Sequence, residues 1–197
     1  MTLITMPAKP VPARIEWTIN QPTQVNRSEF TSRRRVTILP FAPRIRAKVT
    51  LPTILGEEGV FAWRAFAADV EGQANKFRVI ACERDQITGI APVINGAGQG
   101  GRSLQTAGWG AAGLKLKRGQ FVTIGDQLLI LMQDVVSAGD GTAEIQFKPH
   151  IRVVPPNGAV LAVTRPYAVM SMTSDDTGWV ADVGQEYAVS FECEESF

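Results

Sequence analysis

Apolar and polar residues alternate along most of the chain, and this period of two predicts a mainly β protein. Residues 14–19 (RIEWTI), 33–39 (RRRVTIL) and 44–51 (RIRAKVTL) show the alternation clearly. A proline-bounded link at residues 40–43 separates the last two segments. We therefore expect 33–39 and 44–51 to form a hairpin, with part of the arginine side chains on its solvent face.

One segment, residues 57–70 (EEGVFAWRAFAADV), has the period of an amphipathic helix. Glu57 and Glu58 suit the positive end of the helix dipole, and Gly72 is an expected stop. Two interpretations of its aromatic residues stay open: packing in the core, or packing against a neighbouring subunit. The apolar stripe comprises Val60, Trp63, Ala67 and Val70, and Phe66 lies beside it.

A strand expected at 76–84 leads into a glycine-rich segment, residues 85–113, which we expect to be a surface loop. Its GAGQGG run at 96–101 invites comparison with phosphate-binding loops. Such a loop follows a strand and opens a helix, or ends in Lys-Ser/Thr, and neither context is present. We therefore expect no phosphate site there.

The segment from 114 to 165 has the spacing of a β-meander, which suggests a small barrel of the OB or SH3 type. Glycine and aspartate residues provide the turns between its short strands. In the closing strand of the chain, Tyr187, Val189, Phe191 and Cys193 alternate with polar residues. The expected strands of the meander are 120–124, 127–135, 142–148 and 160–164.

The composition is that of a folded globular chain. Of its 197 residues, 45% are hydrophobic and 20% are charged, which argues against disorder. The longest apolar runs are about five residues, far short of the roughly 20 that a membrane helix needs. The N-terminal residues lack the pattern of a signal peptide. One domain or two small ones are expected at this length.

Few residues carry candidate chemistry. His150 is the single histidine, and the sequence lacks further ligands at the spacing that a zinc site needs. Cys82 and Cys193 are expected to be free thiols in a reducing cytosol, with a disulfide between them as the alternative. Because no nucleophile motif, metal-ligand spacing or clear carboxylate pair is present, we expect neither an enzyme nor a cofactor.

Charge is unevenly distributed, although the net charge is only +1. Residues 1–55 contain nine Lys or Arg and two Glu, whereas residues 170–197 contain seven Asp or Glu and no Lys or Arg. Such asymmetry can indicate a nucleic-acid-binding arm, but ends of opposite charge favour pairing with each other. We expect the basic N-terminal strands and the acidic C-terminal strand to lie close together, within one subunit or across a subunit boundary.

Several motifs follow one another in a characteristic order. They are TLP at 50–52, W-x-x-F at 63–66, D-V-x-G-Q-x-x-x-F at 69–77, GAGQGGRSLQTAGW at 96–109, LKRGQFVTIGDQLLIL at 116–131, DGTAEIQFKPHIR and PPNGA within 140–159, GW-x-x-D at 178–182 and FECEESF at 191–197. In this order they resemble the distal tail (Dit) or minor tail protein family of siphophages, from about Arg14 to Phe197.

The resemblance implies a mainly β fold with one helix. A belt domain, residues 1–84 and 165–197, would be a β-sandwich or split barrel, and six copies of it would close into a ring. An inserted OB- or SH3-like barrel, residues 85–164, is too small for the galectin-like receptor domain of some members. The implied function is structural: a distal tail ring that links the tail tube to the tail tip or baseplate hub.

The resemblance also implies the partners. They would be further copies of the chain in a homo-oligomeric ring, the tail tube protein, and the tail hub or tape-measure protein. DNA would only pass through the lumen, and no membrane would be bound. The protein would be made in the host bacterial cytoplasm and reside in the tail of the virion.

We expect inter-subunit contacts where a basic hairpin (33–48) meets an acidic strand (186–195). A ring needs heterologous contacts, unpaired sheet edges are natural joints, and opposite charges would set their register. The candidate contact residues are Arg33, Arg34, Arg35, Arg44, Arg46, Trp63, Phe66, Glu192, Glu194 and Glu195.

A non-catalytic binding domain is the alternative. Trp109 or Trp179, if exposed beside glycine residues, could stack on a carbohydrate. The arginines between Arg33 and Arg46, together with the OB-like segment, could bind nucleic acid, but that segment offers few aromatic residues to stack on bases.

Overall fold

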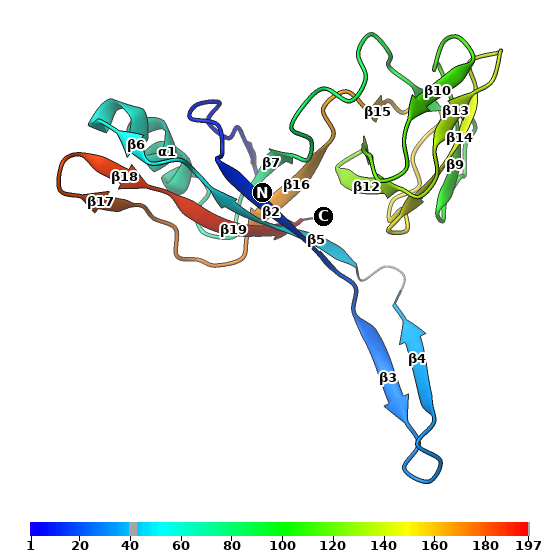
Figure 1. Ribbon diagram of the computed structural model, residues 1–197, viewed down its shortest axis with the longest axis horizontal. Helices are drawn as coiled ribbons and strands as arrows, with labels where there is room; N and C mark the ends of the chain where they lie inside the picture. Colours follow the sequence, from blue (N-terminus) through cyan, green and yellow to red (C-terminus); the bar gives the residue numbers. More distant parts are fainter. Residues whose placement is uncertain (40–42, 197) are drawn as a thin grey trace. The chain divides into compact units, whose positions relative to one another are not determined.

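The computed structural model describes residues 1–39 and 43–196, and the chain forms two compact units (Figure 1). It is mainly β, with one helix among the described residues, as predicted. Unit 1 comprises Met1–Ile19, Ile45–Val79 and the residues from Ala168 onward, and unit 2 comprises Asn20–Arg44 and Ile80–Tyr167. The predicted belt (1–84 and 165–197) and insert (85–164) stay a prediction.

Unit 1 is built on a six-stranded sheet with the order β1-β7-β16-β19-β5-β2. β1 lies parallel to β7, whereas β19 is antiparallel to both β16 and β5. Ile45, Ala47 and Val49 of β5 are buried and alternate with exposed residues, which is the predicted period of two. The strands are β1 (Leu3–Ile4), β2 (Arg14–Asn20), β5 (Arg44–Thr50), β7 (Lys76–Ile80), β16 (Tyr167–Met172) and β19 (Ser190–Glu195).

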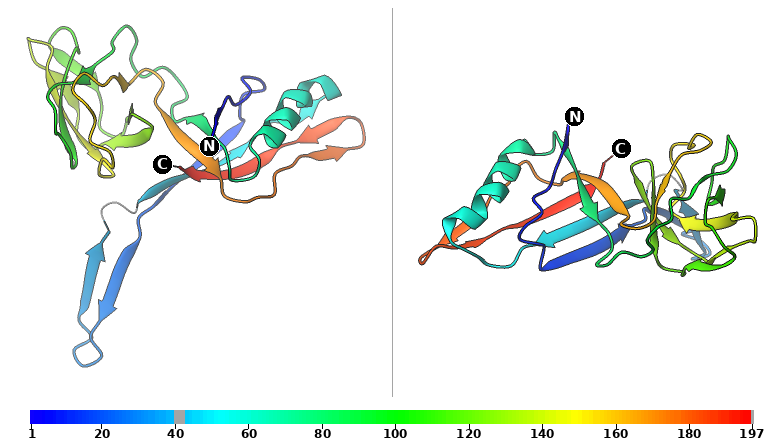
Figure 2. Two further views of the ribbon diagram at one scale, coloured as in Figure 1. Left: turned by 180° about the vertical axis from the view of Figure 1, so that it is seen from behind. Right: turned by 90° about the horizontal axis from the view of Figure 1, so that it is seen from above.

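Helix α1 (Glu57–Asp69) lies along one face of this sheet (Figure 2). The predicted helix, 57–70, is confirmed to within one residue, and Val60 and Trp63 of its stripe are buried together with the adjacent Phe66. The Phe66 ring packs edge-on against Phe77 of β7, with ring centroids 5.2 Å apart. Apolar burial of this helical stripe against the sheet therefore forms the core of unit 1.

A small three-stranded sheet extends the same unit, with the order β17-β18-β6. Its inward residues, Ile54 and Tyr187, are buried and directly opposite each other. The remaining residues of its strands are exposed. The strands are β6 (Ile54–Leu55), β17 (Val180–Asp182) and β18 (Glu186–Ala188).

Unit 2 contains a barrel-like sheet with the order β15-β11-β12-β14-β9-β8. A bridge between Val93 and Val160 joins the two ends of this order and nearly closes the barrel. Its interior is one hydrophobic cluster that includes Leu104, Trp109 and Phe147. The strands are β8 (Val93–Ile94), β9 (Ser103–Ala107), β11 (Phe121–Ile124), β12 (Gln127–Leu131), β14 (Ala143–Lys148) and β15 (Leu161–Ala162), and β10 (Gly113–Leu116) pairs separately with β13 (Val135–Ser137).

Two details of the barrel differ from the prediction. The segment 85–113 is not only a surface loop, because it contains β8 and β9, and β9 pairs with β14 through buried Leu104 and Thr106. The strand expected at 127–135 is two strands, β12 and β13, which belong to different sheets. Glycine-rich flanks and the short length of these strands conceal them from periodicity.

The N-terminal hairpin also differs from the prediction. β4 (Arg34–Ile38) pairs with β3 (Thr23–Arg27), and not with β5. The turn lies between these strands, where the Ser28 Oγ accepts a hydrogen bond from the Thr31 N–H and the Ser28 N–H bonds to the Arg33 carbonyl. The link expected to make the turn, 40–43, falls mostly on residues 40–42, which lie outside the described residues.

Candidate functional site

The basic and acidic ends of the chain meet in neighbouring strands of the unit 1 sheet. Arg46 of β5 lies directly opposite Glu194 of β19, and Lys48 lies opposite Glu192. A nitrogen-to-oxygen distance of 3.3 Å joins each pair. For these four residues the structure shows the first of the two open interpretations, pairing within one subunit. Exposed ion pairs contribute only about 0–1 kcal/mol, so these favour one register of the strands more than they stabilise the fold.

The neighbouring candidates, Arg44 and Glu195, have different surroundings. Arg44 is exposed, whereas Glu195 is fully buried. The Glu195 carboxylate accepts a long hydrogen bond of 3.5 Å from the Ile45 N–H. Glu195 is therefore part of the interior of unit 1 and offers no surface to a second copy.

The prediction that Trp63 and Phe66 of the helix contact a neighbouring subunit is wrong. Both rings are buried, and the Trp63 Nε1 donates a hydrogen bond of 3.2 Å to the Lys9 carbonyl. Phe66 contacts Phe191 as well as Phe77, with centroids 5.9 Å from Phe191. Core packing, the other interpretation of this stripe, is what the structure shows.

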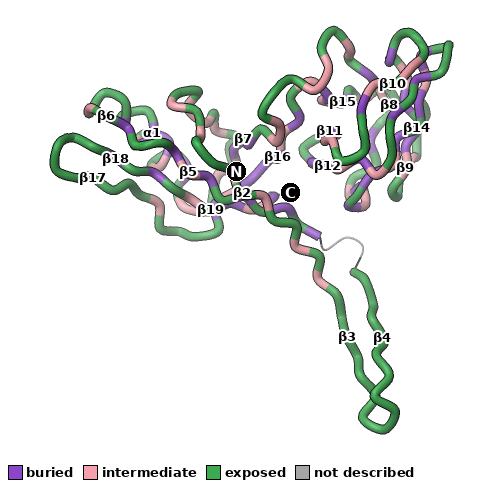
Figure 3. Tube along the Cα trace, in the orientation of Figure 1, coloured by how far each residue is buried: buried purple, intermediate pink, exposed green. Residues whose placement is uncertain are grey.

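Arg33, Arg34 and Arg35 lie on the β3–β4 hairpin, which we call the arm (residues 23–38). Every residue of the arm is exposed, on both of its faces (Figure 3). In the ladder, Val25 lies opposite Val36 and Arg27 opposite Arg34. Cross-strand partners and residues two apart share a face. One side, the arm face, therefore comprises Thr23, Val25, Arg27, Arg34, Val36 and Ile38.

The arm face presents apolar side chains to solvent. Val25 and Val36 are each 45% exposed and Ile38 is 61% exposed. An isolated two-stranded hairpin is marginally stable in water, because too little apolar surface is buried to offset its ordering. The arm is therefore suited to packing against another surface. Sequence reasoning missed β3 because its residues, TQVNR, include a single apolar side chain.

A second exposed surface lies on the three-stranded sheet of unit 1. Its solvent side, which we call the outer face, carries Asp182 directly opposite Glu186, with Leu55 beside Glu186 on β6. Val180 lies opposite Ala188 on the same side. Leu55 is 74% exposed and Val180 is 58% exposed. The outer face thus comprises Leu55, Val180, Asp182, Glu186 and Ala188.

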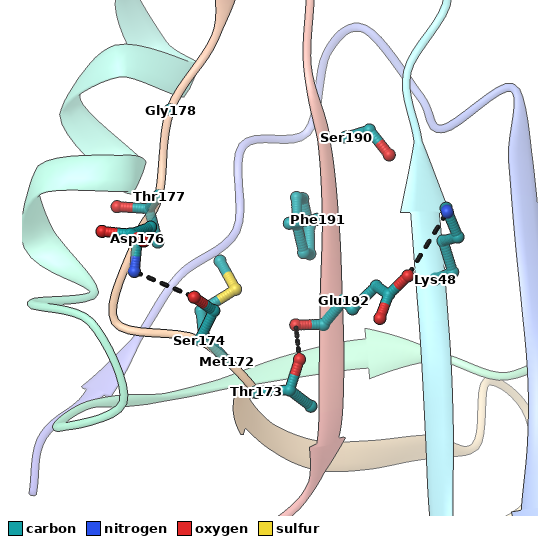
Figure 4. Close-up of a pocket in the computed structure, with 10 residues that line it drawn as sticks. All are labelled: Lys48, Met172, Thr173, Ser174, Asp176, Thr177, Gly178, Ser190, Phe191 and Glu192. Carbon is teal, nitrogen blue, oxygen red and sulfur yellow. Dashed lines mark hydrogen bonds and ion pairs between the residues drawn. The ribbon is translucent and has the colours of Figure 1, made fainter.

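A shallow pocket of about 290 Å³ lies beside β19 in unit 1 (Figure 4). Phe191 forms its apolar part, and the Lys48–Glu192 ion pair stands on one side. The Thr173 hydroxyl donates to the Glu192 carbonyl at 3.2 Å, and the Ser174 hydroxyl accepts from the Asp176 N–H at 3.1 Å. Both hydroxyls are thus hydrogen-bonded to backbone groups of the chain.

The two tryptophans considered for carbohydrate stacking differ in exposure. Trp109 is fully buried, and its Nε1 donates a hydrogen bond of 2.7 Å to the Thr106 hydroxyl. The expectation that Trp109 could stack on a sugar is therefore wrong. Trp179 is 45% exposed, and the Arg64 guanidinium carbon lies 5.2 Å from the centre of its ring. That cation–π contact engages the ring within the chain.

The titratable groups singled out in the sequence are dispersed. Both cysteines are free, and burial raises the pKa of Cys193 to about 12. Desolvation, helped by the Arg102 charge, lowers the pKa of His150. Across residues 1–39 and 43–196, no three His, Cys, Asp or Glu side chains are grouped as metal ligands.

Comparison with known proteins gives no assignment. No protein-family model matches the chain, and a search of curated proteins found no match. Within the described part of the chain, no helix is both long and apolar enough to cross a membrane.

Proposed function

We propose that the chain is a structural component of a phage tail. It assembles with copies of itself into a distal tail ring, which links the tail tube to the tail tip or baseplate hub. The order of sequence motifs from Arg14 onward supports this proposal, as does the mainly β fold with a barrel-like sheet. The protein works by shape and contact and not by catalysis.

The single observation that carries the proposal is the arm. It extends the chain by two paired strands whose every residue is exposed, including the apolar pair Val25 and Val36. An enzyme or a monomeric binding domain gains nothing from ordering such a hairpin in water, whereas a subunit gains an element that becomes buried on assembly. Assembly through one arm and a different acceptor surface is heterologous and closes into a ring when the rotation permits.

Oligomerisation tests the proposal directly. The full chain is compared with a variant in which residues 24–37 are replaced by a short Gly-Ser turn, using sedimentation velocity and negative-stain electron microscopy. We expect hollow rings for the full chain and monomers for the arm deletion, and antibodies should label the tail tip of virions. The exposed barrel substitution Arg118→Glu serves as the matched control and should leave the rings intact.

Two outcomes contradict the proposal. One is a full chain that stays monomeric at the highest attainable concentration. The other is a chain that forms rings but is absent from purified virions, which would separate self-assembly from a role in the tail.

The arginines of the arm favour one alternative function, nucleic-acid binding. Arg27, Arg33, Arg34 and Arg35 are exposed on one hairpin with only Glu29 to offset them. A phosphate-binding arm would be retained on immobilised DNA and released with a steep dependence on salt. We expect weak retention that does not compete with assembly, because the apolar pair on the arm face has no partner on a phosphate backbone.

A further inference from the structure

The outer face of unit 1 carries two acids in an unfavourable position. Asp182 and Glu186 are directly opposite each other across β17 and β18, and both are exposed. Like charges directly opposite in a strand pair destabilise it. Neither carboxylate lies within ion-pair distance of a cation among the described residues. A cation supplied from outside would relieve this repulsion.

The arm face has the same arrangement with the opposite charge. Arg27 and Arg34 are directly opposite each other, and within the described chain neither one lies within ion-pair distance of an acid. Their repulsion is likewise unrelieved. Two adjacent guanidinium groups offer a geometry that carboxylates accept readily.

The apolar neighbours of the two charged pairs also correspond. On the arm, the Val25–Val36 pair is two residues from the arginine pair along both strands. On the outer face, the Val180–Ala188 pair is two residues from the acid pair along both strands. In each case the step is about 7 Å, because residues of one strand rise by about 3.3–3.4 Å. The two faces thus present a charged pair and an apolar pair at the same separation.

From this correspondence we propose that the arm face of one copy docks on the outer face of a second copy. Arg27 and Arg34 meet Asp182 and Glu186, and Val25 and Val36 meet Val180 and Ala188. The proposal rests on the self-assembly argued above and identifies the two surfaces that form the joint. The apolar contacts supply affinity, while the charges select the partner and fix the register.

A second copy is the occupant that these surfaces fit. Every chain carries one arm face and one outer face, so the two are always present in equal number. The surfaces differ, so the contact is heterologous and each copy uses both of them in a closed ring. Docking also gives the arm the apolar neighbours that a two-stranded hairpin lacks.

Charge reversal in separate chains tests the joint. One chain carries Arg27→Glu and Arg34→Glu, and another carries Asp182→Arg and Glu186→Arg. Alone, each chain opposes like charges at every joint, and we expect self-association to weaken by at least about tenfold. An equimolar mixture restores opposite charges at every joint when the two chains alternate. We therefore expect the mixture to form rings with an even number of subunits, seen by sedimentation velocity and electron microscopy.

The controls separate this joint from general charge effects. The barrel variant Lys117→Glu with Arg118→Glu changes the net charge by the same amount as the arm reversal. It should assemble like the unmodified chain, because both residues are exposed and belong to neither face. Circular dichroism verifies the fold of each variant. If a reversed chain fails to fold, the neutral variants Arg34→Gln and Asp182→Asn replace it, and each should weaken assembly and reduce its salt dependence.

The outcomes distinguish the joint from the proposed function. Rings of the unmodified chain together with undiminished assembly of both reversed chains would overturn the joint and leave the ring standing. Failure of the mixture to assemble, with both reversed chains folded, would also overturn it. A monomeric unmodified chain would instead overturn the proposed function itself. Retention of the arm on DNA without any rings would identify nucleic acid as its partner.

Discussion

Cys193 shows how the closing strand sets the chemistry of one residue. Its thiol is buried, lies 3.2 Å from the Met170 Sδ and donates to the Ala47 carbonyl at 3.4 Å. Burial disfavours the thiolate and raises the pKa of Cys193 to about 12, from an ordinary value of 9.0. The half-buried Cys82 also has a raised pKa, with desolvation as the main cause.

The raised pKa of Cys193 makes stability fall at alkaline pH. The folded chain holds the proton more tightly than the unfolded chain, so the contribution is complete below about pH 9 and is lost as the pH rises toward 12. Above pH 9 we expect the unfolding free energy to fall more steeply than in Cys193→Ala, by up to about 1.4 kcal/mol per pH unit. Urea titrations at several pH values measure this difference, and identical slopes would contradict it. In native protein at pH 8, iodoacetamide should modify Cys82 before Cys193.

Local sequence patterns predict the burial of some residues and not of others. The alternation around Cys193 predicted its burial, because a strand on one sheet face repeats every two residues. Glu195, by contrast, was predicted as a contact between subunits but is buried, which is unusual for an acid. Trp109 is similar: glycine neighbours suggest exposure, but the interior of the barrel takes the ring. Such positions depend on contacts with residues distant in the chain, and a local pattern does not contain them.

At the scale of elements, Arg64 joins helix α1 to the strands that carry the outer face. Its guanidinium carbon lies 5.1 Å from the centre of the Tyr187 ring and 5.2 Å from that of Trp179, and its Nη1 lies 3.5 Å from a Glu57 oxygen. Cation–π contacts of this kind contribute about 0.5–1 kcal/mol each at exposed sites and more when desolvated. The helix and the small sheet are thus coupled through one side chain.

Replacement of Arg64 tests this coupling. Arg64→Met keeps the apolar stem and removes the charge, and we expect a loss of about 1–2 kcal/mol in the free energy of unfolding, measured in urea. Arg64→Lys should recover part of the loss, because an ammonium still interacts with the rings but lacks the planar group. Arg118→Met, at an exposed position of the barrel, is the control and should change stability by less than about 0.5 kcal/mol. Equal stability of Arg64→Met and Arg118→Met would show that the contact contributes nothing.

The elements themselves were predictable in proportion to their length and amphipathicity. The helix at 57–69 and strands β2, β5, β11 and β14 follow clear periodicity and were expected. Which strands pair was harder to predict. β4 pairs with β3 and not with β5. This pairing was missed because β3 is a polar strand with one valine and has no recognisable periodicity. The sequence also does not show that Arg27 lies opposite Arg34, or that Asp182 lies opposite Glu186. These like-charged pairs become apparent only from the register of the strands.

At the scale of the whole molecule, unit 2 includes a barrel whose two connections to the chain lie side by side. The Ala81 N–H donates to the Pro166 carbonyl at 2.8 Å, and Arg165 and Asp85 form an ion pair at 3.2 Å. Gln86 donates through its side-chain amide to the carbonyls of Phe121 and Val163. Ends that meet in this way are typical of a segment that can be inserted into another fold at small entropic cost.

This arrangement predicts that residues 80–167 fold when expressed alone. The hydrophobic cluster of the barrel contains only residues from 87 to 163, so removing the rest of the chain takes no side chain from it. The hydrogen bond from Arg152 to the Pro43 carbonyl is lost in the fragment. We expect a dispersed amide spectrum and a cooperative thermal transition, with Trp109 fluorescence as a probe of the closed interior. Trp109→Ala in the same fragment is the destabilised control and should cost about 3–5 kcal/mol, enough to unfold so small a barrel. A wild-type fragment that resembles this control would mean that the barrel depends on the remainder of the chain for its stability. The proposed ring would then be built from subunits that each fold as one cooperative body.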